Sequence, residues 1–232
     1  MSKSAAKRLI PPLPTLPDLP GSSRRAQYSA STKRALVEAA ADLFTENGYA
    51  STSLDAIVSA AQVTKGALYH HYSGKQALFE AVFEQVEGSA AQAIARAVKG
   101  VQDPWEKSLE GLRAFLDVVQ DPTYRRVVIQ EGPAVLGYER FREREERSSF
   151  AIVLDIVNNV LSAGPWELEE PMIEVFSRIF FGALSSAGDS VAMSQKPEET
   201  GARVEAAIAF MLQGMRSLVD QGVELEDPVT GR

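Results

Sequence analysis

Apolar residues recur at helical spacing along nearly the whole chain after a proline-rich start, and no stretch shows the strict alternation of a strand. The first predicted helix spans 31–47 and carries Leu36 and Phe44 on one face. Asn47-Gly48 ends it, because both residues tolerate the left-handed backbone that helix C-termini favour. The pattern therefore predicts an all-α protein.

Two short helices are predicted next, over 53–61 and 64–72, with a three-residue turn between them. Thr52-x-x-Asp55 fits a capping box at the start of the first of these helices, although Ser53 can be the cap instead. A short helix, a tight turn and a second short helix form the pattern of a helix-turn-helix.

The rest of the chain is also predicted to be helical. A long fourth helix runs to about residue 99, and proline after a polar residue or glycine marks most of the later helix starts. The remaining helices are predicted near 104–120, 123–135, 138–162, 168–193 and 198–220.

Four regions follow from this pattern. Residues 1–28 hold five of the twelve prolines together with several basic residues, which predicts a disordered arm. Residues 29–80 are expected to form a three-helix domain, and 81–222 a larger helical domain, with a frayed tail over 223–232. The predicted fold class is thus all-α, with an N-terminal helix-turn-helix domain followed by a larger helical domain.

Composition excludes several classes of function. The chain has no cysteine, which rules out disulfides, thiolate metal sites and cysteine nucleophiles. Its two histidines, His70 and His71, are neighbours, and neither has a glutamate three residues before it, as a di-iron helical bundle requires. We therefore expect no enzyme activity, no metal and no cofactor. No apolar run approaches the ~18 residues of a membrane span, and no secretory signal is evident, so a cytoplasmic protein is expected.

Charge is unevenly distributed along the chain. The formal net charge is −7, but residues 1–80 hold nine Lys and Arg against six Asp and Glu, a net of +3. The remaining residues hold fifteen against twenty-five, a net of −10. A basic front on an acidic body is consistent with two functions in one chain, although a run of charge is more often simply solvated surface.

The second helix of the helix-turn-helix has the chemistry expected of a segment that enters the DNA major groove. The stretch VTKGALYHHYSGK contains no acidic residue. Lys65 can donate to guanine, Gly66 permits a close approach, and Tyr69 can donate to a phosphate or a base. Lys75 lies in the first turn of the fourth helix, where the free amides and the helix dipole also favour a phosphate.

The segment ALVEAAADLFTENGYASTSLDAIVSAAQVTKGALYHHYSGKQALFEAVFE, roughly residues 35–84, resembles the DNA-binding domain of the tetracycline-repressor (TetR) family of bacterial regulators. Two departures from the family pattern stand out. Gln62 occupies a turn position where glycine is usual, which costs about 1 kcal/mol if its backbone is left-handed. Tyr72 replaces the phenylalanine that usually closes the recognition helix.

The resemblance implies contacts to double-stranded DNA by polar or small residues near the helix starts. These residues are Thr52, Ser53, Thr64, Lys65, Gly66, Tyr69, His70, His71 and Lys75. Thr52 and Ser53 would hold phosphate, and Lys65 and His70 would select the sequence, because base contacts specify whereas phosphate contacts position. The basic arm is by default a solvated tail, with contact to the minor groove by Arg24 and Arg25 as the alternative.

The acidic body is expected to bind an effector and to form a homodimer. The helices near 168–193 and 198–220 carry more apolar surface than one chain can cover, and the resemblance implies that they pair with their copies. Packing of both helices inside a monomer remains the alternative. A small, mostly apolar effector would be lined by apolar and aromatic side chains at Leu112, Phe115, Leu116, Tyr138, Phe150, Leu154, Phe176 and Phe180.

The leading hypothesis is therefore a homodimeric transcriptional regulator, most simply a repressor, that binds a pseudo-palindromic operator and is released by the effector. A transcriptional activator and a helical interaction module that does not bind DNA are the alternatives.

Overall fold

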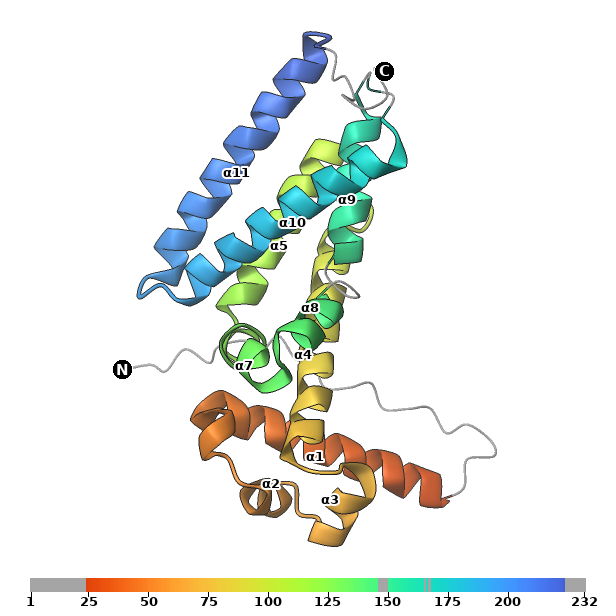
Figure 1. The fold of residues 1–232 in the computed structure, drawn as a ribbon, viewed down its shortest axis with the longest axis vertical. Helices are drawn as coiled ribbons and strands as arrows, with labels where there is room; N and C mark the ends of the chain where they lie inside the picture. Colours follow the sequence, from red (N-terminus) through yellow and green to blue (C-terminus); the bar gives the residue numbers. More distant parts are fainter. Residues whose placement is uncertain (1–23, 146–149, 165, 167, 224–232) are drawn as a thin grey trace. The chain divides into compact units, whose positions relative to one another are not determined.

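The computed structural model of the chain describes residues 24–145, 150–164, 166 and 168–223. Every regular element in these residues is a helix, which confirms the predicted all-α fold (Figure 1). The predicted disordered arm and frayed tail lie almost wholly outside the described residues, as do the side chains of Arg24 and Arg25.

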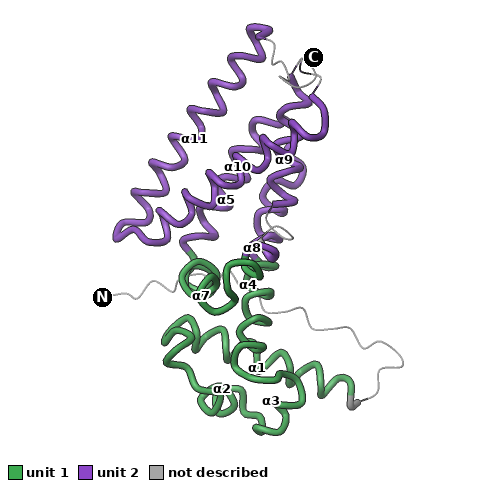
Figure 2. Tube along the Cα trace, in the orientation of Figure 1, with its two compact units in different colours: residues 1–89, 121–141 green, residues 90–120, 142–232 purple. Residues whose placement is uncertain are grey.

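The chain divides into two compact units (Figure 2). Unit 1 comprises residues 1–89 and 121–141, and unit 2 comprises 90–120 and 142–232. The sequence predicts a single domain boundary near residue 80. In the structure, residues 121–141 from the C-terminal side of that boundary belong to unit 1. Helical periodicity shows which face of that segment is apolar, but it does not show which partner covers the face.

Unit 1 begins with three helices and the first turns of a fourth: α1 (Arg24–Ser51), α2 (Leu54–Ala60), α3 (Lys65–His71) and α4 (Lys75–Ala97). The predicted helices agree with these bounds to within a few residues, except that the first one starts earlier. The core of unit 1 is built from aromatic and aliphatic side chains that solvent does not reach, among them Phe44, Leu68 and Phe79. The rings of Phe44 and Phe79 meet edge to face with centroids 5.3 Å apart. Each such side chain stabilises the unit by roughly 1.5–3 kcal/mol on burial.

The turn between α2 and α3 is closed by two backbone hydrogen bonds. The Val63 N–H donates to Val58 O and the Gln62 N–H donates to Ser59 O, both at 3.2 Å. This pairing requires a left-handed residue directly after the helix, and Gln62 has φ 54°. Gln62 therefore has the left-handed backbone for which the family usually has glycine at this position. The glutamine side chain makes this backbone conformation strained.

The segment that returns to unit 1 starts with α6 (Pro122–Tyr124), continues through the π-helix η1 (Arg125–Glu131) and ends with α7 (Gly132–Leu136). The sequence predicts a single α-helix over 123–135, so the π-helical turn is a difference. Asp121 begins the segment, because its carboxylate accepts from the N–H groups of Thr123 and Tyr124 at 2.9 Å. The segment packs mainly against α1.

Glycine is required where α7 begins. A Cβ built on Gly132 would lie 2.9 Å from Phe83 and 3.2 Å from Phe141, so the side chains on either side leave no room for a larger residue. This close approach lets the segment pack directly on the aromatic side chains of the unit.

Unit 2 contains the last turns of α4 and four longer helices: α5 (Pro104–Gln120), α9 (Ala151–Ser162), α10 (Glu170–Ala192) and α11 (Pro197–Asp220). Helices α5, α9 and α10 pack against one another, and α11 packs against α5 and α10. Trp105, Val160 and Leu212 form a buried cluster from three of these helices. Within the predicted helix over 138–162 the structure describes α8 (Tyr138–Glu145) and α9, and residues 146–149 lie outside the described residues.

We predict that Gln62→Gly raises the free energy of unfolding by about 1 kcal/mol, because glycine adopts the left-handed backbone without the steric cost that glutamine meets. Urea denaturation of the full chain measures this difference. Ala61→Gly is the matched control, since Ala61 is right-handed with φ −73°. The control change should instead lower stability by roughly 0.5–1 kcal/mol. An equal response of the two variants would refute strain at Gln62.

Candidate nucleic-acid interface

Helix α3 presents a small polar surface to solvent. Thr64 caps the helix, its Oγ1 accepting from the Ala67 N–H at 3.1 Å. Lys65, Gly66 and His70 are exposed, and Tyr69 is 59% exposed although it is an aromatic residue. The opposite side of the helix carries buried residues that hold it in unit 1. The exposed candidates from sequence are thus brought together on one surface, at and beyond the start of α3.

Lys65 is engaged by an acidic residue from the preceding helix. Its Nζ lies 2.7 Å from a carboxylate oxygen of Asp55, and the two side chains are 64% and 68% exposed. The hydrogen bond to Asp55 and the negative charge of that residue raise the pKa of Lys65 above its usual value. Sequence reasoning considered Asp55 only as part of a helix cap and missed this pairing. The actual cap of α2 is Ser53, which accepts from the Ala56 N–H.

The two histidines differ in their surroundings. Their ring centroids lie 5.1 Å apart, with His70 exposed and His71 half-buried. Burial lowers the pKa of His71 from its ordinary value, and the positive charges of His70 and Lys33 lower it further. A neutral imidazole has only one N–H to donate, so at neutral pH His71 can offer a phosphate a hydrogen bond but little positive charge.

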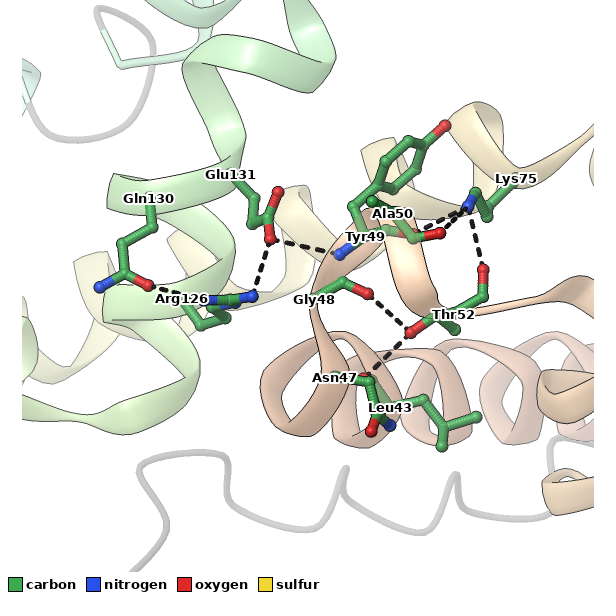
Figure 3. A network of polar contacts seen from close by, with 10 residues as sticks. All are labelled: Leu43, Asn47, Gly48, Tyr49, Ala50, Thr52, Lys75, Arg126, Gln130 and Glu131. Carbon is green, nitrogen blue, oxygen red and sulfur yellow. Dashed lines mark hydrogen bonds and ion pairs between the residues drawn. The ribbon is translucent and has the colours of Figure 1, made fainter.

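Lys75 is directed at the protein backbone (Figure 3). Its Nζ donates to the carbonyl oxygens of Tyr49 at 2.8 Å, Thr52 at 2.9 Å and Ala50 at 3.4 Å, and it lies 4.4 Å from the centroid of the Tyr49 ring. The sequence predicts that Lys75 binds a DNA phosphate, whereas in the structure its ammonium holds the last turn of α1 and the residue that follows it. A lysine at a helix start can donate to phosphate oxygens or to backbone carbonyl oxygens, and the sequence does not distinguish the two.

Thr52 is not part of the exposed surface. It is 3% exposed, and its hydroxyl is within hydrogen-bonding distance of two α1 carbonyl oxygens, Gly48 at 2.8 Å and Leu43 at 3.1 Å (Figure 3). The phosphate contact expected of the Thr52 side chain therefore has no surface from which to act. Ser53 is exposed and remains a candidate, with its oxygen already engaged as the cap of α2.

A second polar group fixes the same segment from the π-helix (Figure 3). Glu131 Oε1 accepts from the Tyr49 N–H at 3.3 Å and lies 3.2 Å from Arg126 Nη2. Gly48, where α1 breaks with φ 78°, stands so close that a Cβ there would lie 2.2 Å from Arg126 and 2.7 Å from Glu131. The Asn47-Gly48 pattern predicted the break, but no sequence signal pointed to Arg126 or Glu131.

Further contacts tie the returning segment to the start of α4. Gln76 Nε2 donates to Val135 O at 3.1 Å, and Arg140 pairs with Glu80 at 3.0 Å. The last turn of α1 and the start of α4 are therefore held by residues from both parts of unit 1.

The residues predicted to line an effector site divide between the units. Seven of the eight lie in unit 2, where Leu112 and Leu116 are buried and the other five are half-buried. Phe150 packs edge to face on Phe181 with centroids 5.5 Å apart. Tyr138 lies in unit 1 and is 72% exposed.

The described residues offer neither a group of metal ligands nor a membrane-spanning helix. They contain no group of three or more histidine, cysteine, aspartate or glutamate side chains placed to hold a metal ion. None of their helices is long and apolar enough to cross a membrane.

Comparison with known proteins identifies the class to which this fold and surface belong. Residues 36–82 match the model of bacterial regulatory proteins of the tetR family. Residues 105–215 match the model of a tetracyclin repressor-like C-terminal domain. The chain belongs to the TetR family, which confirms the resemblance found in the sequence.

Individual relatives agree with this assignment. The Transposon Tn10 TetC protein of Escherichia coli is 30% identical over 132 residues, which are 57% of this chain and 64% of that protein. The regulator UidR of Escherichia coli is 33% identical over 70 residues, 30% of this chain and 36% of UidR. The matched segments thus span less than two thirds of either relative.

Solved structures of the family share the fold. A TetR-family transcriptional regulator from Pectobacterium atrosepticum superposes with a TM-score of 0.70 and 26% identity, over 84% of this chain and 97% of that one. RolR in complex with resorcinol superposes with a TM-score of 0.61 and 20% identity, over 84% of this chain and 96% of that one, which shows a common fold alone. Family and fold are those of regulators rather than of enzymes.

We predict that Gly48→Ala lowers the free energy of unfolding by about 2 kcal/mol, because alanine is strained at positive φ and its Cβ would displace Arg126 and Glu131. Urea denaturation followed by circular dichroism measures the loss. Gly74→Ala is the control, since a Cβ there meets nothing within 4 Å. If the control variant loses as much stability as Gly48→Ala, the special role of Gly48 is wrong.

Proposed function

We propose that the protein is a DNA-binding transcriptional regulator, most simply a repressor, that binds a pseudo-palindromic operator as a homodimer and is released by a small, mostly apolar effector. Membership of the TetR family supports the regulatory role. The observation that carries the DNA-binding proposal is the exposed surface of α3, where Lys65, Tyr69 and His70 stand beside the capped helix start and no acidic residue lies on the helix.

Helix α3 has one buried side and one exposed side, as a helix that enters a major groove requires. Its buried side faces α1 and α2 through Leu68, so the exposed side is free to meet base edges. Among the exposed candidates we propose that Lys65 and His70 read bases, while Ser53, Thr64, Tyr69 and His71 position the backbone. Gly66 permits a close approach. We assign Lys75 and Thr52 to positioning the segment before α2, because their polar atoms are engaged with carbonyl oxygens.

Exposed apolar side chains support the homodimer. Val175 and Ile179 on α10 are 51% and 63% exposed, and Phe210 and Met211 on α11 are 77% and 52% exposed. Apolar surface of this kind is favourably covered by its copy about a two-fold axis. Two recognition helices about 34–36 Å apart would then meet successive major grooves.

An apolar effector suits the aromatic side chains of unit 2. Phe115, Phe150, Phe176 and Phe180 are half-buried there. RolR, a structural neighbour, is solved with resorcinol, and another is described as a fatty acid degradation regulator. We propose an aromatic or aliphatic molecule of similar polarity for this chain. Release follows if the effector favours an arrangement of the dimer that DNA does not.

We predict that Lys65→Ala and His70→Ala each lose roughly 5- to 100-fold of their preference for the operator over random DNA, the worth of one base contact. Gel-shift titration of the full chain with DNA from upstream of its own gene, at two salt concentrations, measures both affinities. Binding to phosphates must weaken as salt rises, because it releases counterions.

Lys99→Ala, an exposed lysine in unit 2, is the control and should leave both affinities unchanged. Absence of salt-dependent binding would favour an interaction module instead. A reporter gene placed behind the bound DNA separates repression from activation.

We predict that Phe210→Glu shifts the protein from dimer to monomer at micromolar concentration, because a buried, unpaired carboxylate at the interface is costly. Sedimentation equilibrium measures the molecular mass. The single chain should remain folded, since the side chain is 77% exposed within it. Lys99→Glu, away from α10 and α11, should stay dimeric. A Phe210→Glu dimer as tight as the original would overturn the proposed interface.

A further inference from the structure

Asp55 is isolated as an acidic residue. It is the only aspartate or glutamate between Glu46 and Glu80, a stretch that contains the whole helix-turn-helix. Its side chain is 68% exposed, and its carboxylate reaches Lys65 at 2.7 Å on the surface that presents α3. A negative charge in this place repels DNA phosphates, so it weakens the binding that we propose for this surface.

Stabilisation of α2 does not by itself account for the position of this carboxylate. An aspartate in the first turn of a helix is favourable because of the helix dipole. However, the cap of α2 is already supplied by Ser53, which accepts from the Ala56 N–H. The carboxylate of Asp55 is instead turned across to the first residue of α3. Pairs this exposed contribute little to folding stability.

The pairing changes what Lys65 can do before DNA arrives. While its ammonium is held by Asp55, Lys65 adds no net charge with which to attract a phosphate at random. A base edge can still compete, because guanine offers two acceptors, O6 and N7, in a fixed geometry. A phosphate offers a similar charge on every sequence and therefore no selectivity. The ion pair thus lowers affinity for arbitrary DNA more than affinity for a matching site.

We propose that Asp55 is a specificity-determining residue, which pairs with Lys65 in the free protein and weakens contacts of Lys65 with phosphates more than contacts with a base acceptor. The inference rests on the proposed DNA-binding function and deepens it. It assigns discrimination between a matching site and arbitrary DNA to Asp55, whose negative charge opposes the binding of DNA.

The test compares Asp55→Asn with the original protein by fluorescence anisotropy. The probes are a duplex enriched by the original protein from a randomised library and a scrambled duplex of the same composition. We expect Asp55→Asn to bind the scrambled duplex about 3- to 10-fold more tightly, with a salt slope steeper by about one. Affinity for the enriched duplex should change by less than about threefold, so discrimination falls. Asp55→Ser provides a second variant if the first does not fold.

Two further measurements separate this mechanism from a general effect of charge. Glu38→Gln removes one exposed acidic charge on α1 and should change both affinities equally and slightly. In a Lys65→Met background, Asp55→Asn should have at most about a third of its effect on the scrambled duplex, because there is no ammonium left to release. An effect of equal size with and without Lys65 would overturn the proposal.

Other outcomes are equally decisive. If the library enriched by Asp55→Asn differs in sequence while scrambled-duplex affinity is unchanged, Asp55 itself reads a base and the proposal is wrong. If the original protein discriminates but Asp55→Asn behaves like Glu38→Gln, the inference fails and the proposed function stands. If the original protein enriches no sequence and binds DNA without salt dependence, the proposed function fails as well.

Discussion

The burial of Leu68 and Tyr72 is the contact on which the interface depends. Helix α3 has only seven residues, and a helix of that length is not stable alone in water. It is helical because these two side chains are 1% and 6% exposed within unit 1, where α3 packs on α1 and α2. The burial of these two side chains fixes the direction of the polar residues on the other side of α3, so the core determines how that surface is presented.

The break in α1 at Gly48 creates a second constraint, which is polar. A helix that ends there leaves carbonyl oxygens without intrahelical donors, and buried carbonyl groups require partners. Lys75 and Thr52 supply donors to these oxygens, and Glu131 accepts from the Tyr49 N–H on the same segment. Charged and polar side chains from α4 and η1 therefore take the place of the missing helical turn. This explains why a lysine that the sequence assigns to DNA is turned toward the protein.

Sequence reasoning predicted the first four helices to within a few residues, apart from the start of the first, because local signals govern them. Pro104 and the Gln62 turn are examples, since proline and capping patterns act over a few residues. It missed the pairing of Lys65 with Asp55 and the contacts of Glu131, which depend on side-chain directions and on contacts across 82 residues. In the structure Asp121–Phe141 belong to unit 1, which the sequence does not indicate, because amphipathic periodicity gives a face but no partner.

The discontinuity of unit 1 bears on how the protein is made. Residues up to Ser89 are synthesised before Asp121–Phe141. During that interval the Tyr49 N–H lacks its carboxylate acceptor, and the aromatic side chain of Phe83 lacks the close approach of Gly132. Contacts between distant parts of a chain also slow its folding. Unit 1, although its larger part is encoded first, is thus completed only after α5 of the other unit has been synthesised, and during that interval the nascent chain exposes apolar surface that chaperones recognise.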